Sequence, residues 1–222
     1  AYYLGILTEF YEKTGIDITK SRFRKLGDKE KAFYAEVAFD FEVETTIGWL
    51  ELVACNYRAD YDLTSHAKKS KQKFEIMDGD NKVLPHVFEI SMGIDRSLYT
   101  ILEHSLKDDK EHERTVLSLK PYLAPIHVGI LSLVKKDGLK EKTDEIYLQL
   151  KRKCDAFLDH SGAIGRRYRR LDEIGSPFAI TVDHQTLEDN TVTIRKRDSM
   201  EQNRINISEL DSILSDSTAY PW

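Results

Sequence analysis

Cysteine is scarce in this chain of 222 residues, and long apolar runs are absent. The two cysteines, Cys55 and Cys154, lie about a hundred positions apart without metal-binding spacing around them, so we expect inert core thiols. No segment approaches the roughly 18 apolar residues of a membrane-spanning helix. The first residues also lack the basic region and cleavage pattern of a signal peptide. The sequence therefore predicts a soluble, cytoplasmic protein with no membrane partner.

A large excess of one charge is absent too. The formal net charge of −5 argues against a protein that coats nucleic acid through bulk electrostatics. Basic residues nevertheless cluster in RRYRR and IRKRD, so a local basic face could bind RNA. None of the seven histidines has the spacing of a metal site, and no metal ligands are predicted. What the chain does have is a 41% hydrophobic content, enough for one large or two medium domains with real cores.

The N-terminal part has the pattern of a helix followed by an antiparallel sheet. A helix is predicted over Tyr2–Thr14, ending at Gly15, and the segments FYAEVAFDFEV and IGWLELVACNY alternate as adjacent strands do. The turn DGDN leads to a strand around Val87–Ser91 and then to an amphipathic helix. Residues Lys107–Arg114, KDDKEHER, have almost no apolar content; we interpret them as a hinge, with a solvated helix end as the alternative.

The C-terminal part alternates strands and helices. Strands are predicted at IHVGILSLV and CDAFLD, and helices at EKTDEIYLQLKRK and AIGRRYRRLDEIG, the last closed by Gly175. PFAITVD and TVTIRKRD are strands around the turn HQTLEDN, and Ser199 with Gln202 predicts a capping box for a final helix. This pattern predicts an α/β domain with a mixed, mainly parallel sheet. The predicted domains are residues 1–113 and 114–222.

Polar residues interrupt two of the apolar strands. Period-two alternation in GWLELVA puts Trp49, Glu51 and Val53 on one face, and in VFEIS it puts Glu89 and Ser91 together. These faces could simply meet solvent, as one face of an antiparallel sheet commonly does. They could instead form a pocket for a small cation such as an ammonium group, because buried carboxylates without a partner are costly.

Two groups of arginines carry similar alternatives. Arg96 begins the helix after the second strand and is either a surface residue or a ligand for an anion or a stacked base. In RRYRR, helical spacing turns Ile164, Tyr168 and Leu171 to the core. The arginines left on the exposed side are Arg166, Arg167, Arg169 and Arg170. They could read unstacked RNA bases, or be solvated and pair with Asp172, Glu173 or Asp198.

Several ordered segments together resemble one enzyme family. GWLE, YRADYDLTSH, EISMGIDR with YTILEHS, LAPIHVGILSLV, SGAIGRRYRRLDEIGSPFAITVD and NTVTIRKRDSMEQNR look like glycyl-tRNA synthetase of the archaeal and eukaryotic class II type. The resemblance runs over nearly the whole chain from RFRKLGDKEKAFYAEVAFDFE onward. It implies the C-terminal part of an antiparallel-sheet catalytic domain over 1–113, without class II motifs 1 and 2, and an α/β anticodon-binding domain over 114–222.

The resemblance also implies roles for the ambiguous residues. Glu51, Glu89 and Ser91 would bind the glycine ammonium, while Glu51 and Arg96 would bind ATP, Arg96 being the catalytic motif 3 arginine. The implied reaction forms glycyl-adenylate from glycine and ATP with Mg²⁺, then transfers glycine to tRNA(Gly), through positioning and electrostatics. A homodimer is implied when the N-terminal portion is present. The implied tRNA contacts are Arg166, Arg167, Arg169 and Arg195.

Some residues near the implied pocket depart from the family pattern. The family has glycine at the position of Ala54, alanine and aspartate at Asn56 and Tyr57, and other residues at Ile90 and Met92. A non-catalytic synthetase-like module that binds RNA or a partner is therefore the alternative function. An unrelated protein-interaction domain would explain none of the pocket residues.

Overall fold

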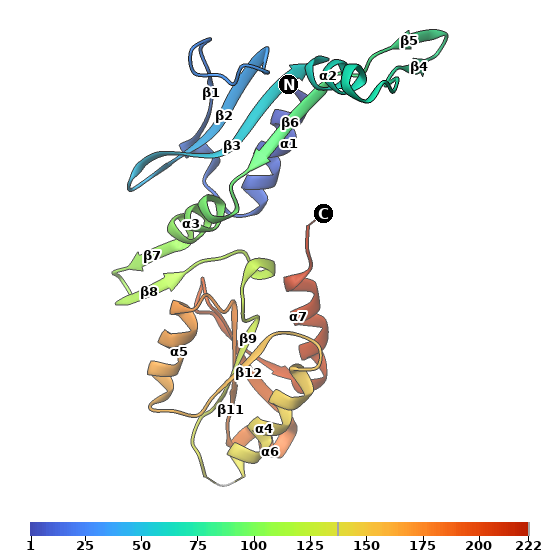
Figure 1. The fold of residues 1–222 in the computed structure, drawn as a ribbon. Coiled ribbons are helices and arrows are strands. Elements are labelled where there is room, and N and C mark those ends of the chain that lie inside the picture. Colours follow the sequence, from blue (N-terminus) through green and yellow to red (C-terminus); the bar gives the residue numbers. More distant parts are fainter. Residues whose placement is uncertain (137, 222) are drawn as a thin grey trace. The chain divides into compact units, whose positions relative to one another are not determined.

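A computed structural model describes residues 1–136 and 138–221, which form two compact units (Figure 1). One unit comprises Asp17–Thr100, and the other comprises Ala1–Ile16 together with Ile101–Trp222. The division after Thr100 falls inside a helix, earlier in the chain than the predicted boundary after residue 113. The assignment of a catalytic part and an anticodon-binding part stays a functional prediction.

The unit Asp17–Thr100 is built on a four-stranded antiparallel sheet in the order β1-β2-β3-β6. Its strands are β1 (Ser21–Lys25), β2 (Val37–Thr45), β3 (Gly48–Ala59) and β6 (Val87–Met92). The other elements are a 3-10 turn η1 (Ile18–Lys20), α2 (Tyr61–Ser70), the β4 (Ile76–Asp78) and β5 (Asn81–Val83) hairpin, and the start of α3 (Ile94–Ser105). The predicted pairing of the two long strands and the DGDN turn are confirmed.

A β-bulge in β3 changes which side chains share a face. Along β2, Asp40 and Glu42 are two residues apart, yet their partners on β3, Ala54 and Glu51, are three apart. The extra residue shifts the alternation, since residues directly opposite each other point to the same side of a sheet. Glu51 therefore lies on the face of Ala54, and the prediction that it shares a face with Val53 is wrong. Period-two reasoning assumes a regular strand and cannot detect a bulge.

The sheet consequently has one apolar face and one polar face. The residues of the apolar face include Phe23, Phe41, Val43, Val53 and Cys55. The rings of Phe23 and Phe41 lie 5.0 Å apart, and Phe41 and Val53 are fully buried. Burial also raises the pKa of the Cys55 thiol to about 11, so the prediction of an inert core thiol is confirmed there. Cys154 is free as well and partly buried.

The second unit contains a five-stranded sheet in the order β10-β9-β11-β12-β13. Its strands are β9 (Val128–Ser132), β10 (Ala156–Asp159), β11 (Phe178–Val182), β12 (Thr191–Lys196) and β13 (Gln202–Asn206). β10 and β11 run parallel to β9, whereas β12 and β13 pair antiparallel. The predicted mixed sheet is confirmed. It is not mainly parallel, however, because parallel and antiparallel pairings are equally frequent.

Helices cover both faces of this sheet (Figure 1). Those packed around it are α4 (Leu139–Leu150), α5 (Ile164–Glu173) and α7 (Leu210–Thr218). One core cluster joins Val128 and Ile130 of β9 to α4 and α7, and a second joins Leu131 to Leu171 of α5. Gly129 permits the close approach of α5, because a Cβ there would lie 2.3 Å from Leu171 Cδ1. The unit also contains α1 (Tyr2–Lys13), η2 (Pro121–Leu123) and η3 (Ile207–Glu209).

The predicted hinge is a β-hairpin. Strand β7 (Leu106–Asp109) pairs antiparallel with β8 (Arg114–Leu117). Charge pairs take the place of apolar side chains in its turn: Asp109 accepts from Arg114 Nε at 2.6 Å and from His112 Nδ1 at 2.9 Å. The Arg114 hydrogen bond, with the one from His112, lowers the pKa of Asp109 to about 2. Charge composition alone therefore misidentified an ordered element.

Two other local predictions are also wrong. The segment HQTLEDN is the short helix α6 (His184–Asp189), started by a capping box between Asp183 and Thr186. Ser199 and Gln202 do not cap a helix, because Gln202 begins β13. The capping box near the C-terminus is formed by Asn206 and Glu209 instead. Within residues 1–136 and 138–221, no helix has the length and apolar character needed to cross a membrane.

Candidate functional site

The polar face of the four-stranded sheet gathers the three predicted glycine-binding residues. On β6, Glu89 lies opposite Asn56 and Ser91 lies opposite Ala54. The bulge turns Glu51 onto that same face. Strict alternation would have placed Glu51 on the opposite side from Glu89 and Ser91, so the irregular register is what brings these residues together.

Arg96 reaches this face from the first turn of α3. The backbone N–H of Gly93 donates to the carbonyl oxygen of Leu52 at 2.9 Å, which fixes the start of the helix against the bulge. Arg96 Nη1 donates to the carbonyl oxygen of Glu51 at 2.9 Å and lies 3.4 Å from Glu51 Oε2. The side chains of Arg96 and Glu51 are 51% and 43% exposed, so this ion pair is open to exchange with a ligand.

Glu89 is held by two residues to which the sequence assigned no role in the site. Its Oε2 accepts from Asn56 Nδ2 at 3.2 Å and from Arg58 Nη1 at 3.1 Å. Arg58 Nη2 also donates to Asp62 Oδ1 at 2.5 Å, and its guanidinium lies 3.9 Å from the Tyr34 ring centroid. Their positions in the sequence could have indicated this role, since alternate residues of β3 beyond the bulge share the face of Glu89.

The rest of the face is rich in paired charges. Arg24 donates to Asp40 Oδ2 and to Glu42 Oε1, both at 2.9 Å, and Arg22 donates to Glu42 Oε2 at 2.7 Å. Burial raises the pKa of Asp40, and the nearby negative charge of Glu51 raises it further. The carboxylates around Glu51 favour a cationic ligand group near it.

The face can bind an ammonium group with its carboxylates and the Ser91 hydroxyl, and an anionic group with Arg96. Among the described residues, no three His, Cys, Asp or Glu side chains converge as a metal cage. Magnesium in nucleotide enzymes is held mainly by substrate phosphates with one or two carboxylates, and Glu51, half-exposed beside Arg96, fits that limited role.

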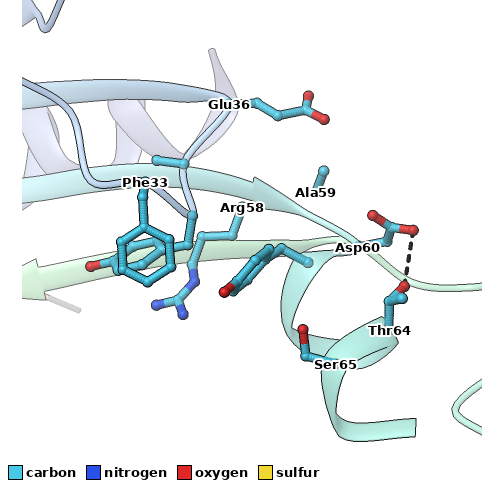
Figure 2. A pocket seen from close by; sticks show the side chains of 10 residues that line it. Phe33, Glu36, Arg58, Ala59, Asp60, Thr64 and Ser65 are labelled. Atoms are coloured by element: carbon cyan, nitrogen blue, oxygen red, sulfur yellow. Dashed lines mark hydrogen bonds between the residues drawn. The ribbon is translucent and has the colours of Figure 1, made fainter. Parts of the chain in front are cut away.

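A pocket of about 320 Å³ lies beside Arg58 and was not expected from the sequence (Figure 2). Its aromatic lining consists of Phe33, Tyr34 and Tyr61. Phe33 is 86% exposed, and its ring lies 5.8 Å from that of Tyr61. Figure 2 shows the Arg58 side chain beside Phe33, and its guanidinium stacks on the Tyr34 ring. The pocket thus surrounds one of the two groups that hold Glu89.

In the second unit, Arg167 was predicted on the exposed side of its helix, and this prediction is wrong. It is 3% exposed, and its Nη1 donates to the carbonyl oxygens of Ser132 at 2.6 Å and Asp159 at 3.3 Å. These carbonyls end the parallel strands β9 and β10. Arg167 therefore satisfies buried backbone groups, and the burial removes the physical basis for RNA contact.

Arg195 is also a buried structural residue. Its Nη1 and Nη2 donate to Asp172 Oδ1 and Oδ2 at 2.8 and 3.0 Å, and its guanidinium lies 5.0 Å from the Tyr168 ring centroid. Arg114 Nη1 from the β7–β8 hairpin donates to Asp172 Oδ2 at 3.0 Å. The predicted alternative had arginines of α5 pair with Asp172, but the arginines that pair with it are Arg195 of β12 and Arg114. Arg195 is 6% exposed in this network, so it is poorly placed to contact RNA.

Two of the four predicted RNA-contacting arginines are accessible. Arg166 is exposed and Arg169 is partly exposed, and neither side chain has a hydrogen-bond or ion-pair partner in the part of the chain that the structure describes. Arg170, by contrast, donates to Asp159 Oδ2 at 2.5 Å. The predicted core contacts of Leu171 and Tyr168 are confirmed. An RNA role for Arg166 and Arg169 stays a prediction.

One further arrangement has the form of a catalytic triad. Ser132 Oγ lies 3.1 Å from His160 Nδ1, and His160 Nε2 lies 2.8 Å from Asp144 Oδ1. Ser132 is completely buried, however, and a nucleophile must be within reach of its substrate. We interpret this chain of hydrogen bonds as a structural link between β9, α4 and the end of β10.

Comparisons with known proteins match both units. A family model described as anticodon binding domain covers residues 127–217. Curated glycine–tRNA ligases are similar over most of the chain. The relative from Treponema denticola is 43% identical over 213 residues, which cover 91% of this chain and 47% of the relative. The one from Archaeoglobus fulgidus is 36% identical, covering 97% and 51%, and the one from Clostridium beijerinckii is 40% identical, covering 99% and 48%.

The fold and these matches define a chain with an anticodon-binding domain of the kind found in aminoacyl-tRNA synthetases. Among those synthetases, the chain is similar over most of its length to glycine–tRNA ligases, and the resemblance noted in the sequence is confirmed. It spans about half the length of the curated relatives it matches.

Replacing Asp172 by Asn should destabilise the protein strongly. The side chain is 1% exposed, and its loss of charge would leave Arg195 buried without its counter-ion and Arg114 with Asp109 alone. Breaking a buried ion pair in this way costs about 3–5 kcal/mol. We expect the urea-unfolding free energy of the anticodon-binding unit to fall by that amount.

The matched control is Glu201→Gln. Glu201 pairs with Lys196, but both side chains are more than half exposed, so the unfolding free energy should be unchanged. Equal stability of the Asp172 variant and the control would contradict the structural role of the buried network.

Proposed function

We propose that the protein containing this chain is a glycine–tRNA ligase that activates glycine with ATP and transfers it to tRNA(Gly). Similarity to curated glycine–tRNA ligases over most of the chain carries the proposal. The gathering of Glu51, Glu89, Ser91 and Arg96 on one sheet face supports it. The finer fold assignment, a partial class II catalytic domain in the unit with the four-stranded sheet, belongs to the same proposal, as do a homodimer and a cytoplasmic location.

Glycine would bind through its ammonium group. The free Oε1 of Glu89, the Ser91 hydroxyl and the Glu51 carboxylate accept hydrogen bonds from a cation on this face. Side chains packed around the α-carbon leave room for hydrogen alone, and larger amino acids are rejected by clash. Steric exclusion discriminates better than the loss of one methylene contact, which is why a small pocket suits this substrate.

ATP would bind beside Arg96. The glycine carboxylate attacks the α-phosphorus, the bond to the leaving pyrophosphate breaks, and glycyl-adenylate forms. Arg96 exchanges its ion pair with Glu51 for the nucleotide and stabilises the phosphate charge. Mg²⁺, when bound, neutralises phosphate oxygens, with Glu51 as the carboxylate available to help hold it.

The second unit would bind the tRNA. The anticodon-binding module covers residues 127–217, and Arg166 and Arg169 are the accessible arginines of its basic helix α5. Guanidinium groups contact phosphates and stack on unpaired bases, both of which an anticodon loop offers. Arg167 and Arg195 would contribute indirectly, by holding the helix on its sheet.

Replacing Glu89 by Gln should weaken the binding of glycine but not that of ATP. The change removes the charge opposite the ammonium group, and a hydrogen bond to a charged group is worth about 10- to 100-fold in affinity. In glycine-dependent exchange of pyrophosphate into ATP by the full-length protein, the KM for glycine should rise by that factor. The KM for ATP should change less than about twofold, since Arg96 is untouched.

Asp78→Asn at the end of β4 is the control, because it removes an exposed carboxylate away from the face. A variant of Glu89 that lost ATP affinity and kept glycine affinity would refute the pocket assignment. Absence of exchange by the unaltered protein, without binding of glycine or ATP, would favour the alternative of a non-catalytic synthetase-like module.

Replacing Arg166 and Arg169 together by Ala should weaken tRNA(Gly) binding. Each lost phosphate contact should lower the slope of log affinity against log salt by about 0.7–0.9. Adenylate formation should be unaffected. Arg152→Ala, an exposed arginine after α4, is the matched control. An equal loss in that control would mean that bulk charge, and not α5, binds the tRNA.

A further inference from the structure

Glu89 is restrained through only one of its two oxygens. Oε2 accepts from Asn56 Nδ2 at 3.2 Å and from Arg58 Nη1 at 3.1 Å. Oε1 has no hydrogen-bond donor among residues 1–136 and 138–221, and the side chain is 30% exposed. A carboxylate fixed at one oxygen and open at the other presents the second oxygen in a defined direction.

The two donors are themselves held in place. Asn56 is 8% exposed, in the middle of β3, where it lies directly opposite Glu89 in the strand register. Arg58 donates to Asp62 Oδ1 at 2.5 Å and stacks 3.9 Å from the Tyr34 ring centroid, among the pocket's aromatic side chains (Figure 2). Neither donor can follow Glu89 freely, so both restrict where its carboxylate points.

The local charge balance also suits a cation. Arg58 is a single positive group shared between the carboxylates of Glu89 and Asp62. The three together keep one net negative charge, so the arginine orients Glu89 without cancelling its attraction for an ammonium group. The other described residue bonded to Glu89, Asn56, is neutral and adds direction without charge.

We propose that Asn56 and Arg58 are positioning residues that clamp Oε2 of Glu89 and thereby aim Oε1 at the glycine ammonium. The inference rests on the proposed function, because Glu89 must be the ammonium ligand. The clamp acts on glycine affinity and leaves the nucleotide side, at Arg96, untouched.

Equilibrium binding of glycine and of ATP to the full-length protein tests the clamp. Asn56→Ala should weaken glycine binding by about 5- to 30-fold, because one donor to a charged group is lost while the other remains. Arg58→Lys keeps the charge but loses the two-pronged geometry, and should weaken glycine binding at least as much. ATP affinity should stay within about twofold of the unaltered protein in both variants.

Two comparisons separate positioning from general damage to the fold. Thr64→Ala removes a hydrogen bond to Asp60 in the same pocket without touching Glu89, so glycine affinity should be unchanged. In a Glu89→Gln background, Asn56→Ala should have little further effect on glycine affinity, because the negative charge that Asn56 helps to aim is gone. Circular dichroism melting of each variant checks that folding is retained.

The outcomes are distinct. Selective loss of glycine affinity that disappears in the Glu89→Gln background supports the clamp. Normal glycine affinity in Asn56→Ala and Arg58→Lys, with a binding-competent unaltered protein, overturns the clamp and leaves the proposed function standing. Failure of the unaltered protein to bind glycine at all overturns both.

Discussion

The bulge in β3 is the constraint on which the candidate site depends. If β3 were regular, Glu51 would point to the face of Phe41 and Val53, where an ionised carboxylate has no partner. The bulge also leaves the Leu52 carbonyl free to accept from Gly93, and that bond fixes the first turn of α3. One irregularity therefore places both Glu51 and Arg96 beside the strand that carries Glu89.

Burial divides the arginines of the second unit into two roles. Arg167 and Arg195 are enclosed and satisfy strand carbonyls and the Asp172 carboxylate. Arg166 and Arg169 have no such partners among the described residues and remain available for a polyanion. Helix α5 is thus anchored to the sheet by some of its basic residues, and the others lie accessible to solvent. Clustering of charge in a sequence does not distinguish these roles, because both use the same residue type.

Much of the fold followed from apolar patterning. The long strands β2 and β3, the buried strand β9 and the helices α4 and α5 have strong periodicity, and burial enforces it. The errors lie where local polar interactions decide the structure. The Asp109–Arg114 pair orders a hairpin, and the Asp183–Thr186 box starts α6. At the site, sequence motifs found Glu89 and Arg96 but not Asn56 or Arg58, since cross-strand register sets those contacts.

We propose that glycine and the nucleotide meet on the polar face of this sheet, with Glu89 at one end and Arg96 at the other. The most direct test is a crystal structure of the full-length protein with a non-hydrolysable glycyl-adenylate analogue. We expect the ammonium nitrogen within hydrogen-bond distance of Glu89 Oε1, and Arg96 turned from Glu51 to the nucleotide. An analogue bound away from this face, or an Arg96 still paired with Glu51 beside a bound nucleotide, would contradict this proposal.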